Sequence, residues 1–138
     1  MMIGILISIA IGATNPNVTQ ANIMSNICVH GWTKTIRPPA SYTNKLKLKQ
    51  MAEQHIVGKP SDYEEDHFLP LEAGGNPTDP ANLWPQPWHG PWNAHLKDAV
   101  ETALHRDICA GKITLQAAQD AIRKDWQAEY VRRFGQPK

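Results

Sequence analysis

The 138-residue chain lacks a strong excess of charge, a long apolar segment and any internal repeat. Its formal net charge is +1 at pH 7, so it has no basic surplus of the kind that phosphate neutralisation usually leaves in nucleic-acid-binding proteins. A near-neutral total still permits a local basic face, so any binding argument must rest on a site. The length and the apolar content of 41% indicate one globular domain and argue against disorder or a multi-span membrane protein.

Charged side chains are also missing from the N-terminus. Residues 1–13 are almost wholly apolar, and no lysine, arginine, aspartate or glutamate precedes Lys34. A run of about a dozen apolar residues is too short to cross a bilayer but is typical of a secretory leader, although this one has no basic residue before it. We therefore predict a signal peptide over residues 1–21 and a single domain over residues 22–138. The mature protein would be secreted or periplasmic and free of the membrane, with a cytoplasmic location as the alternative.

Cysteine is scarce, and no Cys-x-x-Cys pair is present: the chain has only Cys28 and Cys109. In an exported protein one intramolecular disulfide is the default expectation. Such a bridge would close a loop of roughly 80 residues and contribute about 4 kcal/mol in the chain-entropy model. Two alternatives stay open, namely a structural zinc site that adds His30 and His105, and a pair of free buried thiols.

The N-terminal half of the chain contains one clear helix pattern. Residues 43–54 are rich in good helix formers, and Thr43 is a suitable N-cap, so we predict a helix there. Residues 15–25 are mostly polar and are predicted to be an unstructured lead-in.

Two strands and two further helices are expected in the second half. Residues 63–71 are predicted to be a strand that leads into a loop, and residues 83–86 a short second strand after a Gly-Gly-Asn-Pro turn. Apolar residues then recur at helical spacing from Asn93 onward, and Gly111 is a good residue to follow the end of that helix. Thr114 can cap a last helix. The order is helix, strand, strand, helix, helix, which predicts an α+β fold.

One stretch carries a pattern that points to chemistry. It reads EDHFLPLEAGG and is followed by NLWP and by an asparagine at a helix start. This arrangement resembles the His-Asn-His (HNH) endonucleases, also called ββα-metal nucleases, over residues 63–108. The resemblance implies a small ββα-metal core at about residues 63–110, flanked by N-terminal and C-terminal helices. The matching residues are Asp66, His67, Gly74, Gly75, Asn82, Leu83 and Asn93.

The same resemblance implies a metal-dependent endonuclease that hydrolyses phosphodiester bonds in nucleic acid, with DNA expected before RNA. It assigns His67 as general base and Asp66 as metal ligand. It also implies that Asn82 holds the loop and orients the base, and that Asn93 completes the metal site. The chemistry suits these residues, because hydrolysis needs an activated water and a cation, and imidazole is a good base near neutral pH.

The metal follows from the expected ligands. A carboxylate with an amide oxygen favours a hard, hydrated cation, so we expect Mg²⁺ or Mn²⁺. His89 and His95 are alternatives to Asn93 at the third position. Helical geometry favours Asn93, because it shares a face with the apolar residues that should pack on the hairpin.

The remaining polar residues near this pattern have two readings each. Lys97 follows Asn93 by one turn and is either a phosphate contact or a surface residue. Glu64, Glu65 and Glu72 are expected to be solvated or to stabilise loops, with Glu65 as the candidate for an extra carboxylate near the metal.

Two other functions compete with a nuclease: a module that binds nucleic acid without cleaving it, and a disulfide-stapled structural or interaction protein. The oligomeric state is not indicated.

Overall fold

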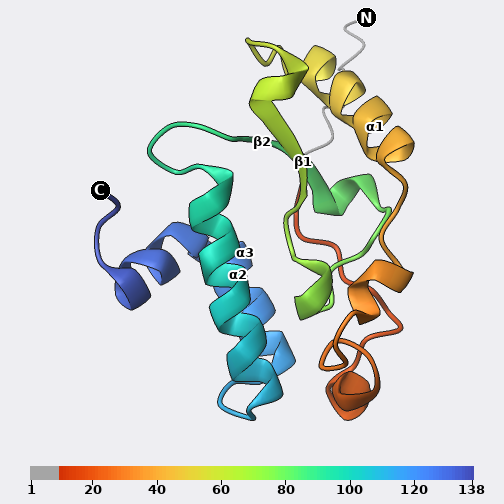
Figure 1. The fold of residues 1–138 in the computed structure, drawn as a ribbon, viewed down its shortest axis with the longest axis vertical. Coiled ribbons are helices and arrows are strands. Elements are labelled where there is room, and N and C mark those ends of the chain that lie inside the picture. The colour runs from red at the N-terminus through yellow and green to blue at the C-terminus, as the bar shows by residue number, and fades with distance from the viewer. Residues whose placement is uncertain (1–9) are drawn as a thin grey trace, which may run out of the picture.

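The structure, a computed structural model, describes residues 10–138. Within that range it is an α+β fold with three α-helices and one antiparallel sheet of two strands (Figure 1). This confirms the predicted class and the predicted order of the main elements. They are α1 (Ala40–Glu53), β1 (Tyr63–His67), β2 (Leu83–Pro87), α2 (Ala94–Cys109) and α3 (Leu115–Phe134).

The two strands pair from Tyr63 opposite Pro87 to His67 opposite Leu83. β1 ends at His67, within the range predicted to pass from strand to loop, because the chain there bends around a buried asparagine instead of extending the ladder. Side chains alternate along a strand, so Glu64 and Asp66 share one face of the hairpin while Glu65 lies on the other.

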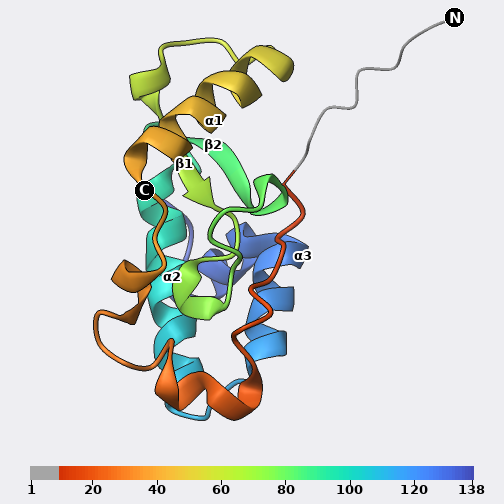
Figure 2. The ribbon, with the colours of Figure 1, turned by 90° about the vertical axis from the view of Figure 1, so that its right-hand side faces the viewer.

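The hairpin lies between α1 and the pair formed by α2 and α3 (Figures 1 and 2). Two side chains of α1 fasten it to the strands: Lys47 Nζ donates to the Tyr63 carbonyl at 3.0 Å, and Gln50 Nε2 donates to the Leu83 carbonyl at 2.9 Å. α1 begins three residues before the predicted start, since the extended Pro39 is its N-cap. The prediction of Thr43 as the cap was wrong.

The ends of α2 and α3 confirm the predicted roles of Gly111 and Thr114, and they show Asn93 as the N-cap of α2. Asn93 Oδ1 accepts from the backbone N–H groups of His95 and Leu96, and Thr114 Oγ1 accepts from that of Ala117. Gly111 follows α2 with φ of +73°, a conformation that glycine adopts without strain. α2 is thus held by its own capping residues at the position where it faces the hairpin.

The predicted unstructured lead-in is part of the core, so that prediction was wrong. Val18 and Ile23 are buried, and residues 20–25 form a short 3₁₀-helix. Gln20 Oε1 also accepts from the backbone N–H of Leu115 at 2.7 Å, which joins this segment to α3. The few apolar side chains of a mostly polar stretch are enough to anchor it, because burial of each one is favourable.

The segment before Val18 also packs on the domain. Thr14 forms an antiparallel bridge with Gly75, and Arg123 of α3 donates to the Gly12 carbonyl at 2.8 and 3.1 Å. Residues 10–21 of the predicted signal peptide are therefore in the packed structure, and residues 1–9 lie outside the described residues. Among the described helices, none is both long and apolar enough to cross a membrane.

The predicted disulfide is present, and it replaces the zinc and free-thiol alternatives. Cys28 and Cys109 are bonded across a sequence separation of 81 residues, with their Cα atoms 5.7 Å apart. A ring nitrogen of His105 lies 2.7 Å from the Ile27 carbonyl beside the bridge. Together these contacts hold the chain around residue 28 on the last turn of α2. A disulfide is typical of proteins in oxidising compartments.

Candidate active site

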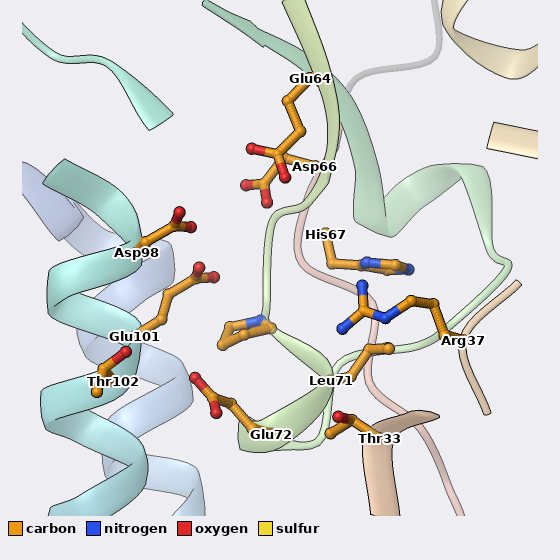
Figure 3. Close-up of a pocket in the computed structure, with 11 residues that line it drawn as sticks. Thr33, Arg37, Glu64, Asp66, His67, Leu71, Glu72, Asp98, Glu101 and Thr102 are labelled. Carbon is orange, nitrogen blue, oxygen red and sulfur yellow. The ribbon is translucent and has the colours of Figure 1, made fainter. Parts of the chain in front are cut away.

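A polar pocket of about 360 Å³ opens between the hairpin, α2 and the segment that contains Thr33 and Arg37 (Figure 3). Carboxylates from β1 and α2 gather on one side of it, and His67 and Arg37 lie on the other. The residues that line it are Thr33, Arg37, Glu64, Asp66, His67, Pro70, Leu71, Glu72, Asp98, Glu101 and Thr102.

Three of the carboxylates lie close enough together to hold one metal ion. Glu64 and Asp66 point the same way from β1, and Asp98 faces them from α2, with one oxygen of each within 4.8 Å of the others. Burial raises the pKa of Glu64 to about 7, and the charges of Asp66 and Asp98 add to this effect. Clustered carboxylate oxygens suit a hard divalent cation, whose charge would favour their ionised forms.

His67 is held in a form that can act as a base. The side chain is 7% exposed, and its Nε2 lies 2.9 Å from the Pro77 carbonyl. Because a carbonyl only accepts, this contact places the proton on Nε2 and leaves Nδ1 as an acceptor. Burial lowers the pKa of His67, against the opposing effects of the Pro77 hydrogen bond and of Asp66. The imidazole is therefore neutral at pH 7.

Asn82 joins two parts of the connection that follows His67, at Leu69 and at Asn76. Its Oδ1 accepts from the Leu69 N–H at 2.8 Å, and its Nδ2 donates to the carbonyls of Leu69 and Asn76 at 3.0 and 2.9 Å. The side chain is fully buried. The Asn76 loop continues into Pro77, so Asn82 supports the carbonyl that binds the histidine ring. The positioning role that the resemblance implies for Asn82 stays a prediction.

Gly75 is required for this close packing. A Cβ built on Gly75 would lie 1.8 Å from the Leu69 carbonyl oxygen and 2.8 Å from Asn82 Nδ2. Any side chain would force the backbone of the two loops apart. The Gly-Gly turn noted in the sequence therefore serves the packing around Asn82.

The structure does not bring Asn93 to Asp66. Both functional atoms of the Asn93 side chain are in use, since Oδ1 caps α2 and Nδ2 donates to the Gly90 carbonyl at 3.0 Å. Asn93 lines a separate cavity near the C-terminus. His89 and His95 are exposed and do not line the carboxylate pocket either. The residue that α2 contributes beside Asp66 is Asp98.

Lys97 lies in the interior, where a phosphate in solvent would not reach it. Its side chain is 1% exposed and donates to Asp66 and Glu101. Burial alone would lower the pKa of Lys97, but these two carboxylates outweigh it and hold the pKa above its ordinary value. The exposed cation at this pocket is Arg37, whose charge acts on Glu64 and His67.

Glu65, the candidate for an extra carboxylate, lies on the opposite face of the hairpin from Glu64. Its two carboxylate oxygens are buried and have no hydrogen-bond partner among the described residues. Burial raises the pKa of Glu65 to about 8. The extra carboxylate of the acidic group is Glu64, not Glu65.

Sequence reasoning did not select Glu64, Asp98, Glu101 or Arg37. The i, i+2 spacing of Glu64 and Asp66 on a strand was an available signal, because such residues share a face. The i, i+4 spacing of Lys97 and Glu101 was another. Arg37 reaches the pocket from a distant segment.

Comparisons with known proteins add no identity. No protein-family model matches this chain. No curated protein and no solved structure matches it either. The likeness to HNH endonucleases therefore rests on the residue pattern in the sequence.

Proposed function

We propose that this protein is a metal-dependent phosphodiesterase of the HNH type, an endonuclease whose expected substrate is DNA, exported to an oxidising compartment. One observation carries the proposal: a group of three carboxylates and a neutral, oriented histidine line the same pocket. The disulfide supports the location.

The cation would be held by Glu64, Asp66 and Asp98, with Mg²⁺ or Mn²⁺ as the best candidates. Bound there, it would neutralise the negative charge that develops on the phosphate. This ligand set replaces the expected pair of Asp66 and Asn93, since Asn93 is occupied as a helix cap.

The chain's own groups supply the rest of the hydrolysis. His67 Nδ1 accepts a proton from a water molecule as the water oxygen bonds to phosphorus. The bond from phosphorus to the leaving oxygen then breaks. The exposed guanidinium of Arg37 can donate to a non-bridging phosphate oxygen. Asn82 positions the base through the loop that contains Pro77.

The first test is cleavage of supercoiled plasmid in Mg²⁺, in Mn²⁺ and in EDTA. We expect metal-dependent nicking that falls by about a hundredfold or more in His67→Ala, the low end of a general-base contribution. His89→Ala is the matched control, since His89 is exposed outside the pocket.

Other results would favour the competing functions. Binding of DNA without cleavage in any metal would indicate a binding module. Intact DNA and RNA, no binding and no effect of metal on thermal stability would indicate a structural protein, because a ligand of the native state must raise stability.

A further inference from the structure

A buried positive charge, that of Lys97, is paired with two carboxylates that line the pocket, Asp66 and Glu101. The Lys97 ammonium lies 2.8 Å from Oδ2 of Asp66, 3.0 Å from Oε2 of Glu101 and 3.1 Å from the carbonyl oxygen of His67. An ammonium group has three N–H donors, and these three oxygens accept them. Its position is therefore set by the protein and leaves no donor for a substrate.

We propose that Lys97 is an internal cation of this site, a positioning residue that orients Asp66 and limits the affinity of the carboxylates for a divalent ion. The inference rests on the proposed function for its link to catalysis. Its electrostatic part concerns only the carboxylates and the ion.

The Lys97 ammonium shares one of its carboxylate partners with the expected cation. Asp66 accepts from Lys97 and also belongs to the group that would hold the ion, together with Glu64 and Asp98. Charges in a buried environment are weakly screened, so the ammonium repels a divalent cation placed a few ångströms away. Glu101 partly balances Lys97 from the other side. Removal of Lys97 should tighten cation binding, and removal of the Glu101 charge should weaken it.

Lys97 also orients Asp66, so we expect its loss to slow turnover even though the cation binds more tightly. Asp66 Oδ2 accepts from Lys97 and from Trp84 Nε1 at 3.2 Å, which leaves Oδ1 to face the pocket. The contact of Lys97 with the His67 carbonyl ties the backbone of the base to the same ammonium. Without Lys97, the carboxylate and the histidine lose a common anchor.

A purely structural lysine would behave differently. The loss of such a lysine would lower the stability of the fold. Cation binding and turnover would then either both weaken or both stay unchanged. A lysine that contacts phosphate would change the KM for nucleic acid and leave the affinity for Mn²⁺ alone. Tighter Mn²⁺ binding combined with slower turnover distinguishes an internal cation from both.

The experiment is calorimetric titration of Mn²⁺ into the full chain and three variants, with circular dichroism to check folding. We expect Lys97→Met to bind Mn²⁺ about tenfold or more tightly, and Glu101→Gln about tenfold or more weakly. Lys47→Met is the matched control, because Lys47 also donates to a β1 carbonyl but lies outside the pocket. Its Mn²⁺ affinity should not change. Plasmid cleavage by Lys97→Met should fall about tenfold.

Each result decides the question. Unchanged or weaker Mn²⁺ binding by folded Lys97→Met overturns the inference, and so does a wild-type chain that takes up no Mn²⁺. If Lys97→Met does not fold, Glu101→Gln decides, and an unchanged affinity in that variant overturns it. If the affinities shift as expected while no protein cleaves nucleic acid, the charge balance holds and the proposed nuclease function fails.

Discussion

At the scale of the residue, burial sets the chemistry of β1. Neighbouring side chains on this strand point to opposite faces, so Glu64 lines the carboxylate pocket, while Glu65 lines a different pocket with Ala40 and Thr43 of α1. Both carboxyl groups are desolvated, which raises the pKa of each. Of the two, only Glu64 belongs to the group of carboxylates that could hold a metal ion. The two glutamates should therefore affect different properties of the protein. Glu64 is a candidate metal ligand, and for Glu65 we expect an effect on stability.

Glu65 should make the protein less stable as the pH rises. Its folded-state pKa is about 8, above the ordinary value of 4.5, so between these values the folded state binds more protons than the unfolded state. The free energy of unfolding must therefore fall as the pH increases through this window. Glu65→Gln mimics the protonated form and should be more stable than the wild type at pH 8 to 9, with little difference at pH 5.

Urea unfolding across this pH range provides the measurement. Glu53→Gln is the control, since Glu53 lies on α1 away from the strand and pairs only with Lys49 in the described structure. A difference between wild type and Glu65→Gln that does not depend on pH would contradict the prediction.

At the scale of the element, the N-terminus of α2 determines what Asn93 can do. The first N–H groups of a helix need acceptors from outside the helix. Asn93 supplies one, and its amide group donates to Gly90 at the same time. The carboxylates of α2 that reach the pocket, Asp98 and Glu101, lie about one and two turns further along.

Asn93→Ala should therefore act on stability and not on the metal. We expect a loss of about 1 kcal/mol in the free energy of unfolding, typical of a lost N-cap, and an unchanged affinity for Mn²⁺. Asn93→Ser should recover most of the stability, because serine also caps helices. A large fall in Mn²⁺ affinity in both variants, without a matching loss of stability, would restore Asn93 as a metal ligand.

At the scale of the whole molecule, the disulfide anchors the segment, residues 28–37, that forms one wall of the pocket. The Cys28–Cys109 bridge holds the segment that continues to Thr33 and Arg37 against the end of α2. Those two residues form the wall of the pocket that faces the carboxylates (Figure 3). A site built from residues 33 to 102 thus depends on a covalent link outside it.

Loss of the bridge should weaken the fold and loosen that wall. Cys28→Ser with Cys109→Ser should cost roughly 2–5 kcal/mol in the free energy of unfolding, the usual range for a native disulfide in a small domain. Limited proteolysis should then cut between residues 28 and 40 sooner than in the oxidised wild type. Equal stability and an identical cleavage pattern would show that packing alone holds the segment.

Local sequence patterns determined the elements of this protein and part of its site. Helical periodicity and capping residues located α2 and α3, the Gly-Gly turn and flanking β-type segments located the hairpin, and two cysteines in an exported-looking chain indicated the disulfide. These features depend on neighbours in the chain, so a single sequence carries them. The choice of Asp66, His67 and Asn82 rested on a local motif in the same way.

Only the tertiary structure decided which partners meet those residues. Asp98 and Glu101 reach Asp66 because α2 packs on one face of the hairpin, and Arg37 arrives from a segment fixed by the disulfide. Lys97 became a buried cation and not a phosphate contact for the same reason. Desolvation and charge pairing depend on distances between distant parts of the chain. Sequence spacing does not contain those distances.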